Sequence, residues 1–495
     1  MILEIIILTS IIQSVEIGGV NMSSRKPFID RTEELLTLEK EYAKSAASFV
    51  IVYGRRRVGK TAMINEFLSR HKGCNLYFLA TQEAEEQNRK VFRDQVADLI
   101  GNELLKSADA DWLTIFRLLS EHTTADRKII VMDEFQYIGK SNPAFPSVMQ
   151  KIWDTVLKDT NIMLILCGSL ITLMQQQTLD YSSPLYGRRT AQIRLKQIRF
   201  PYYPDFYPGK SEEELIPFYA VTGGVPKYIE TFSDCQNVED GIDQYVLNPQ
   251  GYLYEEPYFL LQNEVSEIGS YFSLIRAIAM GNRKLSEISA WLGVKQTNIP
   301  KYLKTLMDLD LIEREVPVTE NNPEKSKSGL YRITDNYIAF WFKFVYPYRA
   351  FLERGEKAYV MEQIRKMFVQ NYLSYVYEDL CREKMWAFSS MNLWDFRFDK
   401  LGRYWGPVCG EVDILGIDSI GGNMIIGECK YSVAEKGLSV LHTLQEKARA
   451  LEAKTKLSCN NYVVFSTSGF SKGLKDEAAR NPNILLMDTF SPKKY

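Results

Sequence analysis

Residues 54–61, with the sequence GRRRVGKT, have a composition and spacing suited to holding phosphate groups. The glycines of this GxxxxGK[ST] pattern let backbone N–H groups wrap a phosphate, Lys60 has the reach for the β and γ oxygens, and Thr61 offers a hydroxyl to magnesium. An apolar run from Phe49 to Tyr53 precedes the segment, and a helical pattern follows it. We therefore predict a phosphate-binding loop, or P-loop, with ATP and Mg²⁺ as cofactors. The loop residues predicted to bind the nucleotide are Gly54, Arg55, Arg56, Arg57, Val58, Gly59, Lys60 and Thr61.

An acidic motif further along the chain complements this loop. Four apolar residues, Ile129 to Met132, predict a buried parallel strand that ends at Asp133 and Glu134. Asp133 is expected to hold magnesium together with Thr61, and Glu134 is expected to polarise the attacking water. In the simpler alternative, the acidic pair only caps a loop. We expect ATP hydrolysis as well as ATP binding.

Polar residues also follow or precede the later apolar runs. Ser169 ends the run NIMLILCGS and is predicted to lie beside the γ-phosphate as a sensor. Arg188 and Arg189 lie in a glycine-containing turn before the run TAQIRL, where a guanidinium is suited to neutralise charge on the transferred phosphoryl group. A solvated arginine pair fits this turn nearly as well. If either arginine acts in trans, hydrolysis requires a homo-oligomer.

A second cluster of charged residues lies near the end of the chain, in GEVDILGIDSIGGNMIIGECKYS. Two strands flanking SIGG predict a hairpin in which Asp418 pairs with Asn423. The same register sets Asp413 opposite Glu428, on a face that is otherwise apolar toward the turn. Like charges directly across a ladder are destabilising, so this pair calls for a compensating cation.

A divalent metal is one cation that fits this cluster. A second Mg²⁺ or an Mn²⁺ ion, held by Asp413 and Glu428, would lower the pKa of a bound water. Lys430 would orient that water or stabilise a charged transition state, and Glu378 on the preceding predicted helix would complete the metal ligands. In the alternative, the strand end is frayed into solvent and binds no metal.

The elements that position these residues differ along the chain. Strand–helix alternation from Phe49 to Leu195 predicts a parallel sheet with helices on both faces. From Ser270 to Ile333 the pattern changes to three short helices and two strands, which is the order of a winged helix-turn-helix. The sequence therefore predicts an α/β protein with a helical middle.

The predicted third helix of the middle part is basic. No acid occurs between Glu287 and Asp308, whereas Lys295, Lys301 and Lys304 do. Such a face is able to contact phosphates and base edges of DNA. The alternative is a lid or protein–protein module that does not contact DNA.

Bulk composition limits the other possibilities. A length of 495 residues suggests about three domains. A net charge of -2 argues against a molecule that coats nucleic acid, so any nucleic-acid contact has to come from a local patch. Seven cysteines without a CxxC pair argue against a disulfide framework or a zinc site and favour the cytoplasm. We predict no membrane partner, and residues 1–21 are predicted to be a non-structural extension ahead of an alternative start at Met22.

Several motifs taken in order resemble the archaeal-type ATPase family, which is related to AAA and signal-transducing P-loop NTPases. They are Asp30-Arg31, GRRRVGKT, DEFQYI, CGS, PLYGRRT and TGGVPKYIE. The resemblance implies that residues 28–31 lie near the adenine and that the Gly-Gly-x-Pro helix belongs to a lid. The order Glu378, Asp413, Glu428-x-Lys430 resembles the restriction-endonuclease-like PD-(D/E)xK superfamily, although Val412 stands where a proline is usual. This last part also resembles the C-terminal domain of unknown function that accompanies archaeal-type ATPases.

The expected fold is therefore a P-loop NTPase parallel sheet, a winged helix and a restriction-endonuclease-like α/β domain. The predicted boundaries are 22–235 for the ATPase domain with its lid, 236–335 for the winged helix-turn-helix and 336–495 for the nuclease-like domain. The predicted function is an AAA-type ATPase coupled to a metal-dependent nuclease-like domain that acts on nucleic acid. The alternative is a regulatory or scaffold ATPase whose C-terminal domain binds DNA or protein without cleavage.

Overall fold

The computed structural model describes residues 28–124, 126–391 and 393–493. The predicted extension, residues 1–21, lies outside the described residues. Residues Arg31–Tyr495 form one compact unit, and the predicted domain boundaries within it stay a prediction. Within the described ranges, no helix combines the length and apolar character that a membrane span requires.

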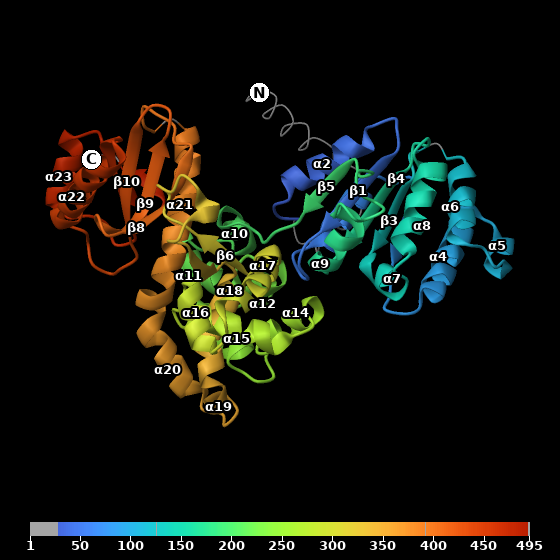
Figure 1. The fold of residues 1–495 in the computed structure, drawn as a ribbon, viewed down its shortest axis with the longest axis horizontal. Coiled ribbons are helices and arrows are strands. Elements are labelled where there is room, and N and C mark those ends of the chain that lie inside the picture. The colour runs from blue at the N-terminus through green and yellow to red at the C-terminus, as the bar shows by residue number, and fades with distance from the viewer. Residues whose placement is uncertain (1–27, 125, 392, 494–495) are drawn as a thin grey trace. The chain divides into compact units, whose positions relative to one another are not determined.

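A five-stranded parallel sheet forms the centre of the first part (Figure 1). Its order is β2-β3-β4-β1-β5, and all neighbouring pairs are parallel. The strands are β1 (Ser48–Tyr53), β2 (Asn75–Leu79), β3 (Ile129–Asp133), β4 (Met163–Gly168) and β5 (Ala191–Arg194). Every residue of β1, β3 and β4 is buried, as expected for apolar central strands covered on both faces. The predicted parallel α/β sheet is confirmed.

Helices precede the first strand and connect most of the later ones. They are α2 (Thr32–Tyr42), α3 (Lys60–Arg70), α4 (Glu85–Ile100), α5 (Glu103–Ser107), α6 (Trp112–Glu121), α7 (Gln136–Ser141), α8 (Phe145–Ile152) and α9 (Ile171–Met174). The strand register pairs Tyr53 with Gly168 and Met132 with Leu166. Because parallel strands end at the same edge, the residues that follow β1, β3 and β4 meet there.

A helical segment follows β5 and contains the predicted Gly-Gly-x-Pro helix. Its helices are α10 (Tyr203–Phe206), α11 (Glu212–Thr222), α12 (Pro226–Phe232), α13 (Val238–Gly241) and α14 (Glu256–Glu264). Gly223 ends α11 with φ of 61°, and Gly224 follows with φ of 75°. A Cβ atom on Gly224 would lie 2.2 Å from the Ile198 carbonyl oxygen. The turn between α11 and α12 therefore requires glycine at this position.

The middle part has three helices and a two-stranded antiparallel sheet. These elements are α15 (Ile268–Ala279), α16 (Leu285–Leu292), α17 (Pro300–Asp308), β6 (Ile312–Glu315) and β7 (Leu330–Ile333). Pro300 is the first residue of α17, where its missing N–H costs no helical hydrogen bond.

A six-stranded mixed sheet forms the last part, in the order β13-β12-β11-β10-β9-β8 (Figure 1). Its strands are β8 (Lys400–Gly406), β9 (Gly410–Asp418), β10 (Asn423–Lys430), β11 (Ser458–Ser466), β12 (Ile484–Asp488) and β13 (Ser491–Lys493). The pairs β10–β11 and β11–β12 are parallel, and the other pairs are antiparallel. The helices of this part are α18 (Asn336–Phe340), α19 (Arg349–Leu352), α20 (Lys357–Phe368), α21 (Ser374–Ser390), α22 (Leu438–Thr455) and α23 (Lys472–Arg480).

The β9–β10 hairpin has the predicted register, but β9 is not a regular strand. Asn423 pairs with Asp418, and the pairing continues in step as far as Gly427. On its other edge, β9 pairs with β8 at Val412–Tyr404 and again at Leu415–Gly402. Between these pairs, two residues of β9, Asp413 and Ile414, lie opposite one residue of β8. This bulge interrupts the alternation of side chains. The prediction that Asp413 shares one face with the apolar residues toward the turn is therefore wrong.

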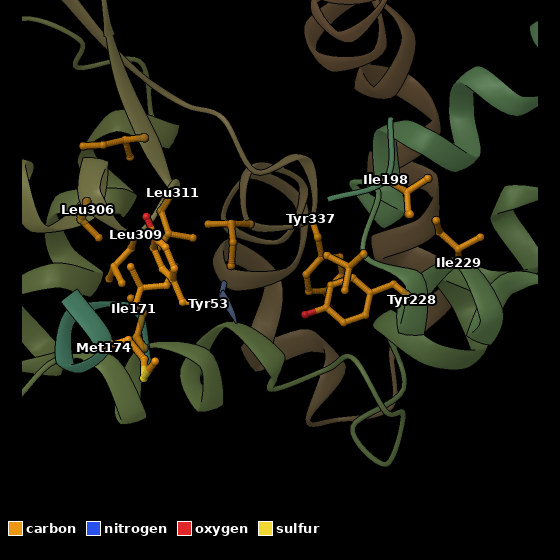
Figure 2. Close-up of a cluster of buried hydrophobic side chains, with 14 of the residues drawn as sticks. Tyr53, Ile171, Met174, Ile198, Tyr228, Ile229, Leu306, Leu309, Leu311 and Tyr337 are labelled. Carbon is orange, nitrogen blue, oxygen red and sulfur yellow. The ribbon is translucent and has the colours of Figure 1, made fainter. Parts of the chain in front are cut away.

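The parts of the compact unit share a buried core. Figure 2 shows Tyr53, Ile171 and Met174 of the ATPase part beside Leu306, Leu309 and Leu311 of the middle part. The same view shows Ile198, Tyr228 and Ile229 near Tyr337, at the start of the C-terminal part. The carboxyl edge of the first sheet therefore lies against later parts of the chain.

Candidate functional site

The P-loop connects β1 to α3 and encloses the side chain of Lys60. The Lys60 ammonium donates to the carbonyl oxygens of Gly54 and Arg55, at 2.8 Å each. Burial lowers the pKa of this ammonium, while nearby thiol and carboxylate groups counteract part of that effect. A Cβ atom on Gly54 would lie 2.3 Å from the Leu195 carbonyl oxygen, and Gly59 has φ of 95°. Both glycines are therefore required by the shape of the loop.

Thr61 and Asp133 lie together as predicted for a magnesium site. The Thr61 hydroxyl donates to Asp133 Oδ2 at 3.2 Å, and Asp133 is buried. The hydroxyl of Tyr77 on β2 donates to the same oxygen. These oxygen ligands fit Mg²⁺, which prefers hard donors and binds proteins through few carboxylates. Sequence reasoning missed Tyr77, because only the β2–β3 pairing brings it beside Asp133.

Glu134 adopts a left-handed backbone conformation and is held by neighbouring side chains. Its φ is 53°, and its own N–H donates to Asp133 Oδ1 at 2.8 Å. The Ser169 hydroxyl donates to Glu134 Oε2 at 2.7 Å, and Gln136 donates to the same oxygen. The structure therefore brings Ser169 to the predicted base, and its hydrogen bond in this state goes to Glu134.

The three arginines of the P-loop direct their side chains to separate partners. Arg55 is buried and forms an ion pair with Asp335, which precedes α18. Arg57 pairs with Glu256 at the start of α14. Arg56 donates to the Tyr137 hydroxyl at 2.6 Å. The three side chains therefore anchor the loop to other elements, and nucleotide binding by the backbone N–H groups of these residues stays a prediction.

We expect Asp335→Asn to destabilise the fold strongly. The asparagine retains an oxygen at the position of Oδ1, which accepts from the Ile338 N–H at 2.7 Å, but it removes the counter-ion of buried Arg55. The free energy of unfolding should fall by about 3–5 kcal/mol, measured by urea denaturation. Asp310→Asn is the matched control, because Asp310 pairs with Arg194 at 2.8 Å in a partly exposed position and should cost only about 0–1 kcal/mol. Equal losses in the two variants would contradict this assignment.

The backbone of the turn that holds Arg188 and Arg189 lies at the opposite end of β1 from the P-loop. They precede Thr190, whose N–H donates to Phe49 O at 2.7 Å near the amino end of β1. The P-loop begins after Tyr53 at the other end, about 13 Å further along the strands. Arg188 also pairs with Asp154 at 2.8 Å. Burial raises the pKa of Tyr53, the last residue before the loop, and Arg189 is among the cations that oppose this shift. The structure therefore does not bring Arg188 to the P-loop of the same chain, and the role of the arginine pair in hydrolysis stays a prediction.

Two further residues beside the loop were not identified from sequence as site residues. Arg31, which the resemblance placed near the adenine, donates to the carbonyl oxygens of Val58 at 2.9 Å and Lys196 at 2.7 Å, so it braces the loop. Glu264 of α14 accepts from the Ile171 N–H at 3.4 Å, and its Oε2 has no hydrogen-bond partner. Burial raises the pKa of Glu264 to about 7. Neither contact follows from a local motif.

The C-terminal charged cluster brings Asp413 close to Glu428. Asp413 Oδ2 accepts from the Cys429 N–H at 2.9 Å, and Lys430 donates to Glu428. Burial first, and Glu428 second, raise the pKa of Asp413. Burial opposes the charge on Lys430, but Glu428 outweighs it and raises the pKa of that ammonium. The sequence prediction that these three residues lie together is consistent with this geometry.

Glu378 of α21 lies on the other side of this cluster. Burial, and then the charge of Asp413, raise the pKa of Glu378. Its Oε2 is buried without a hydrogen-bond partner, although Arg403 lies 3.6 Å and Arg382 4.0 Å away. Arg382 also donates to the carbonyl oxygen of Asp413 at 2.9 Å. Arg382, which sequence reasoning missed, therefore connects Glu378 to Asp413, and Arg403 lies beside Glu378.

The three carboxylates do not form the predicted metal centre in this structure. No group of three or more His, Cys, Asp or Glu side chains in residues 28–124, 126–391 and 393–493 is arranged to hold a metal ion. The Glu428 carboxylate forms ion pairs with Lys430 and with Lys447 of α22, the latter at 3.4 Å. Basic side chains therefore supply the compensating charge that the sequence prediction assigned to a metal.

The parallel sheet, the glycine-bounded loop around Lys60 and the Thr61–Asp133 pair define a P-loop ATPase. A family model for an ATPase domain predominantly from Archaea matches residues 28–232, and a model for archaeal and bacterial proteins of unknown function matches residues 341–441. An uncharacterized protein of Methanocaldococcus jannaschii is 33% identical over 463 residues, which cover 93% of this chain and 99% of the relative. The chain therefore belongs to the archaeal-type ATPase family, in the form that carries this C-terminal domain of unknown function.

Other similarities are shorter or more distant. An uncharacterized ATP-binding protein of Methanocaldococcus jannaschii is 49% identical over 45 residues, 9% of this chain and 76% of the relative. The Walker-type ATPase PABY2304 of Pyrococcus abyssi has a TM-score of 0.48 at 19% identity, covering 66% of this chain and 99% of its own. The Aeropyrum pernix ORC2 protein has a TM-score of 0.42 at 12% identity, covering 68% of this chain and 98% of its own. Neither family model describes a nuclease, so the PD-(D/E)xK resemblance stays a prediction.

Proposed function

We propose that this chain hydrolyses ATP at the P-loop and acts on nucleic acid through its middle and C-terminal parts. The observation that carries the proposal is the convergence of Lys60, the Thr61–Asp133 pair and the Ser169–Glu134 pair at one edge of the sheet. These residue types at this edge supply what phosphoryl transfer to water requires: phosphate positioning, magnesium ligands and a base.

Each residue has a separate part in the proposed hydrolysis. Bound Mg²⁺ would neutralise charge on the phosphate oxygens, with Thr61 and Asp133 as its protein ligands. Lys60 would exchange its two carbonyl partners for phosphate oxygens. Glu134 would orient the attacking water, and Ser169 would keep the Glu134 carboxylate in place through their hydrogen bond.

The middle part supports a nucleic-acid contact. Its element order is that of a winged helix-turn-helix, with α17 in the place of the recognition helix. Lys295, Lys301 and Lys304 are all exposed. Gln296 and Asn298, just before α17, are exposed as well and are able to hydrogen-bond base edges. This local basic face supplies the patch that the near-neutral net charge of -2 requires of any nucleic-acid contact.

The C-terminal part supports nucleic-acid cleavage as the proposed activity. Asp413 and Glu428 lie at adjoining positions of a hairpin, with Lys430 two residues further along β10. This is the arrangement that the PD-(D/E)xK resemblance implies, and Glu378 has a free buried oxygen beside it. Asp413 and Glu428 would hold a divalent ion, Mg²⁺ or Mn²⁺, only where Lys430 and Lys447 release Glu428, and such an ion would supply an activated water.

A regulatory or scaffold ATPase without cleavage is the second candidate. It is favoured by the cations that already satisfy the carboxylates, namely Lys430 and Lys447 at Glu428 and Arg403 near Glu378. In this alternative the C-terminal part binds nucleic acid or protein, and its charged cluster stabilises the fold.

Asp413→Ala distinguishes the two candidates. If the cluster cuts nucleic acid, wild-type protein with Mg²⁺ or Mn²⁺ should cleave single-stranded or duplex DNA or RNA, and the variant should lose that cleavage while its ATP turnover stays within about twofold. Gel assays with and without ATP measure the first activity, and phosphate release measures the second. Glu411→Ala, an exposed acid two positions earlier in β9, is the matched control. Wild-type protein that leaves every substrate intact would rule out the cleavage proposal and favour the second candidate.

A further inference from the structure

A cavity of about 260 Å³ lies where the middle part meets α21, away from the P-loop. Its charged lining consists of Arg283, Arg332, Lys343, Asp379, Arg382 and Arg403. We call it the arginine cavity. These residues come from the loop before α16, from β7, from the segment after α18, from α21 and from β8.

The arginine cavity has more cations than anions in its wall. Five of the six charged lining residues are basic, and the one acid, Asp379, pairs with both Arg332 and Arg382. Burial works to raise the pKa of Asp379, but these two arginines outweigh it and lower that pKa. Arg332 has a second acid, Glu313, outside the cavity. The charges of Arg332 and Arg382 are therefore at least partly compensated within the protein.

Lys343 is a cation in this wall without an acidic partner among the described residues. Its ammonium donates to the carbonyl oxygen of Asn371, and burial lowers its pKa. A partly buried ammonium that faces only a carbonyl group is costly unless an anion approaches it. An anion in the cavity would therefore stabilise the charged form of Lys343.

Arg283 and Arg403 are only loosely compensated. Both approach Glu315, at 3.3 Å for Arg283 and 3.8 Å for Arg403. Glu378 and Glu411 lie 3.6 Å and 3.8 Å from Arg403, which is longer than a direct charged hydrogen bond. Burial, followed by repulsion from Arg403 and Arg332, outweighs Glu315 and lowers the pKa of Arg283. Arg283, with Glu315 as its one ion-pair partner among the described residues, therefore retains N–H groups for an anion, while Arg403 shares its charge among three acids.

We propose that the arginine cavity binds a phosphate group. Guanidinium groups match phosphate oxygens with paired hydrogen bonds, and a phosphate would supply the anionic partner that Lys343 lacks and a further one for Arg283. The volume of about 260 Å³ is just below the roughly 300 Å³ at which small-molecule sites begin. The cavity therefore encloses the phosphate and little of the molecule that carries it.

The source of that phosphate is either a nucleic-acid strand or a free nucleotide. Arg382 and Arg403 also lie beside Glu378, so a phosphate in the cavity would be adjacent to the candidate cleavage cluster. This position favours a strand phosphate. Phosphate binding itself does not depend on the proposed function, whereas its assignment to a strand does.

Calorimetric titration tests the proposal on the full chain with the P-loop saturated by Mg·ADP. The probes are inorganic pyrophosphate and a short single-stranded oligonucleotide. The double variant Arg283→Gln/Lys343→Gln should weaken binding of pyrophosphate at least tenfold. Arg365→Gln is the matched control, because this exposed arginine of α20 pairs only with Glu239 among the ion pairs of the described residues. It should leave binding unchanged.

Pyrophosphate tests whether the cavity binds phosphate at all, and the oligonucleotide tests whether nucleic acid supplies that phosphate. Competition between oligonucleotide and pyrophosphate supports the site with a strand phosphate as its ligand. Pyrophosphate binding that the double variant weakens, without oligonucleotide binding, supports the site and counts against nucleic acid as its source. Absence of pyrophosphate binding, or binding equal in wild type and double variant, overturns the proposal. Lys343→Gln alone, at a partly exposed position, provides the same comparison if the double variant does not fold.

Discussion

Replacing Lys60 with alanine should reduce ATP turnover by at least about 10³-fold. Lys60 is the cation enclosed by the P-loop, and its two hydrogen bonds hold it against Gly54 and Arg55. Alanine removes the charge that would meet the β and γ phosphate oxygens. Phosphate release from ATP in the presence of Mg²⁺ measures the effect.

Lys44→Ala is the control for the Lys60 variant. Lys44 lies in the same part of the chain, is half exposed and pairs with Glu41 at 2.6 Å. Its replacement should leave ATP turnover unchanged. Turnover by Lys60→Ala that equals turnover by Lys44→Ala would show that this loop is not the site of hydrolysis.

Glu134→Gln should separate binding from hydrolysis. Glutamine retains the size of the side chain and can still accept from Ser169, but it is neutral and cannot take a proton from water. ATP hydrolysis should therefore fall by about 10²–10⁴-fold, while ATP affinity stays within a few-fold of wild type. Fluorescent-nucleotide titration measures the affinity, and single-turnover phosphate release measures the hydrolysis.

Glu83→Gln is the matched control for Glu134→Gln. Glu83 is an exposed acid that accepts from the Thr81 hydroxyl at 2.9 Å. Its replacement should change neither affinity nor hydrolysis. If Glu134→Gln loses ATP binding together with hydrolysis, Glu134 supports the shape of the loop, and another group activates the water.

The nucleotide site could largely be predicted from sequence because its information is local. The glycine spacing, Lys60 and Thr61 lie within eight positions, and Asp133 and Glu134 directly follow an apolar strand. Parallel strands bring such strand ends to one edge, so the pattern sets the geometry. Tyr77 was missed because β2 carries no polar motif, and its place beside Asp133 comes from strand order alone.

The partners of Arg55 and the position of the Arg188–Arg189 turn could not be predicted from neighbouring sequence. Arg55 looks like a loop residue, but its partner Asp335 is 280 positions away. The turn of Arg188 and Arg189 precedes β5, and only the parallel β1–β5 pairing shows that its backbone lies at the opposite end of β1 from the P-loop. Such partners depend on the packing of the whole compact unit.

The C-terminal cluster was predicted in part for the same reason. The short turn fixed the β9–β10 register, so Asp413 and Glu428 lie near each other. The bulge at Asp413 arises from pairing with β8, which has no signal in the hairpin sequence. Lys447 comes from α22, nineteen residues beyond Glu428, so its ion pair was not predictable from the strand pattern.

Two ion pairs connect the P-loop to later parts of the chain. Arg55 and Arg57 connect the loop to Asp335, just before α18, and to Glu256, at the start of α14. Any displacement of the loop backbone therefore changes two ion pairs with later parts of the chain. This is the physical link by which a nucleotide at the P-loop would influence the later parts of the chain.

Phosphate release from ATP by the purified wild-type chain is the most direct test of the central claim, hydrolysis at this P-loop. The measurement is made with Mg²⁺ and with EDTA, beside Lys60→Ala and Glu134→Gln. We predict catalytic turnover by the wild type that requires Mg²⁺ and is lost in both variants. Wild-type release that does not exceed release by the variants, at any ATP concentration, would contradict the account.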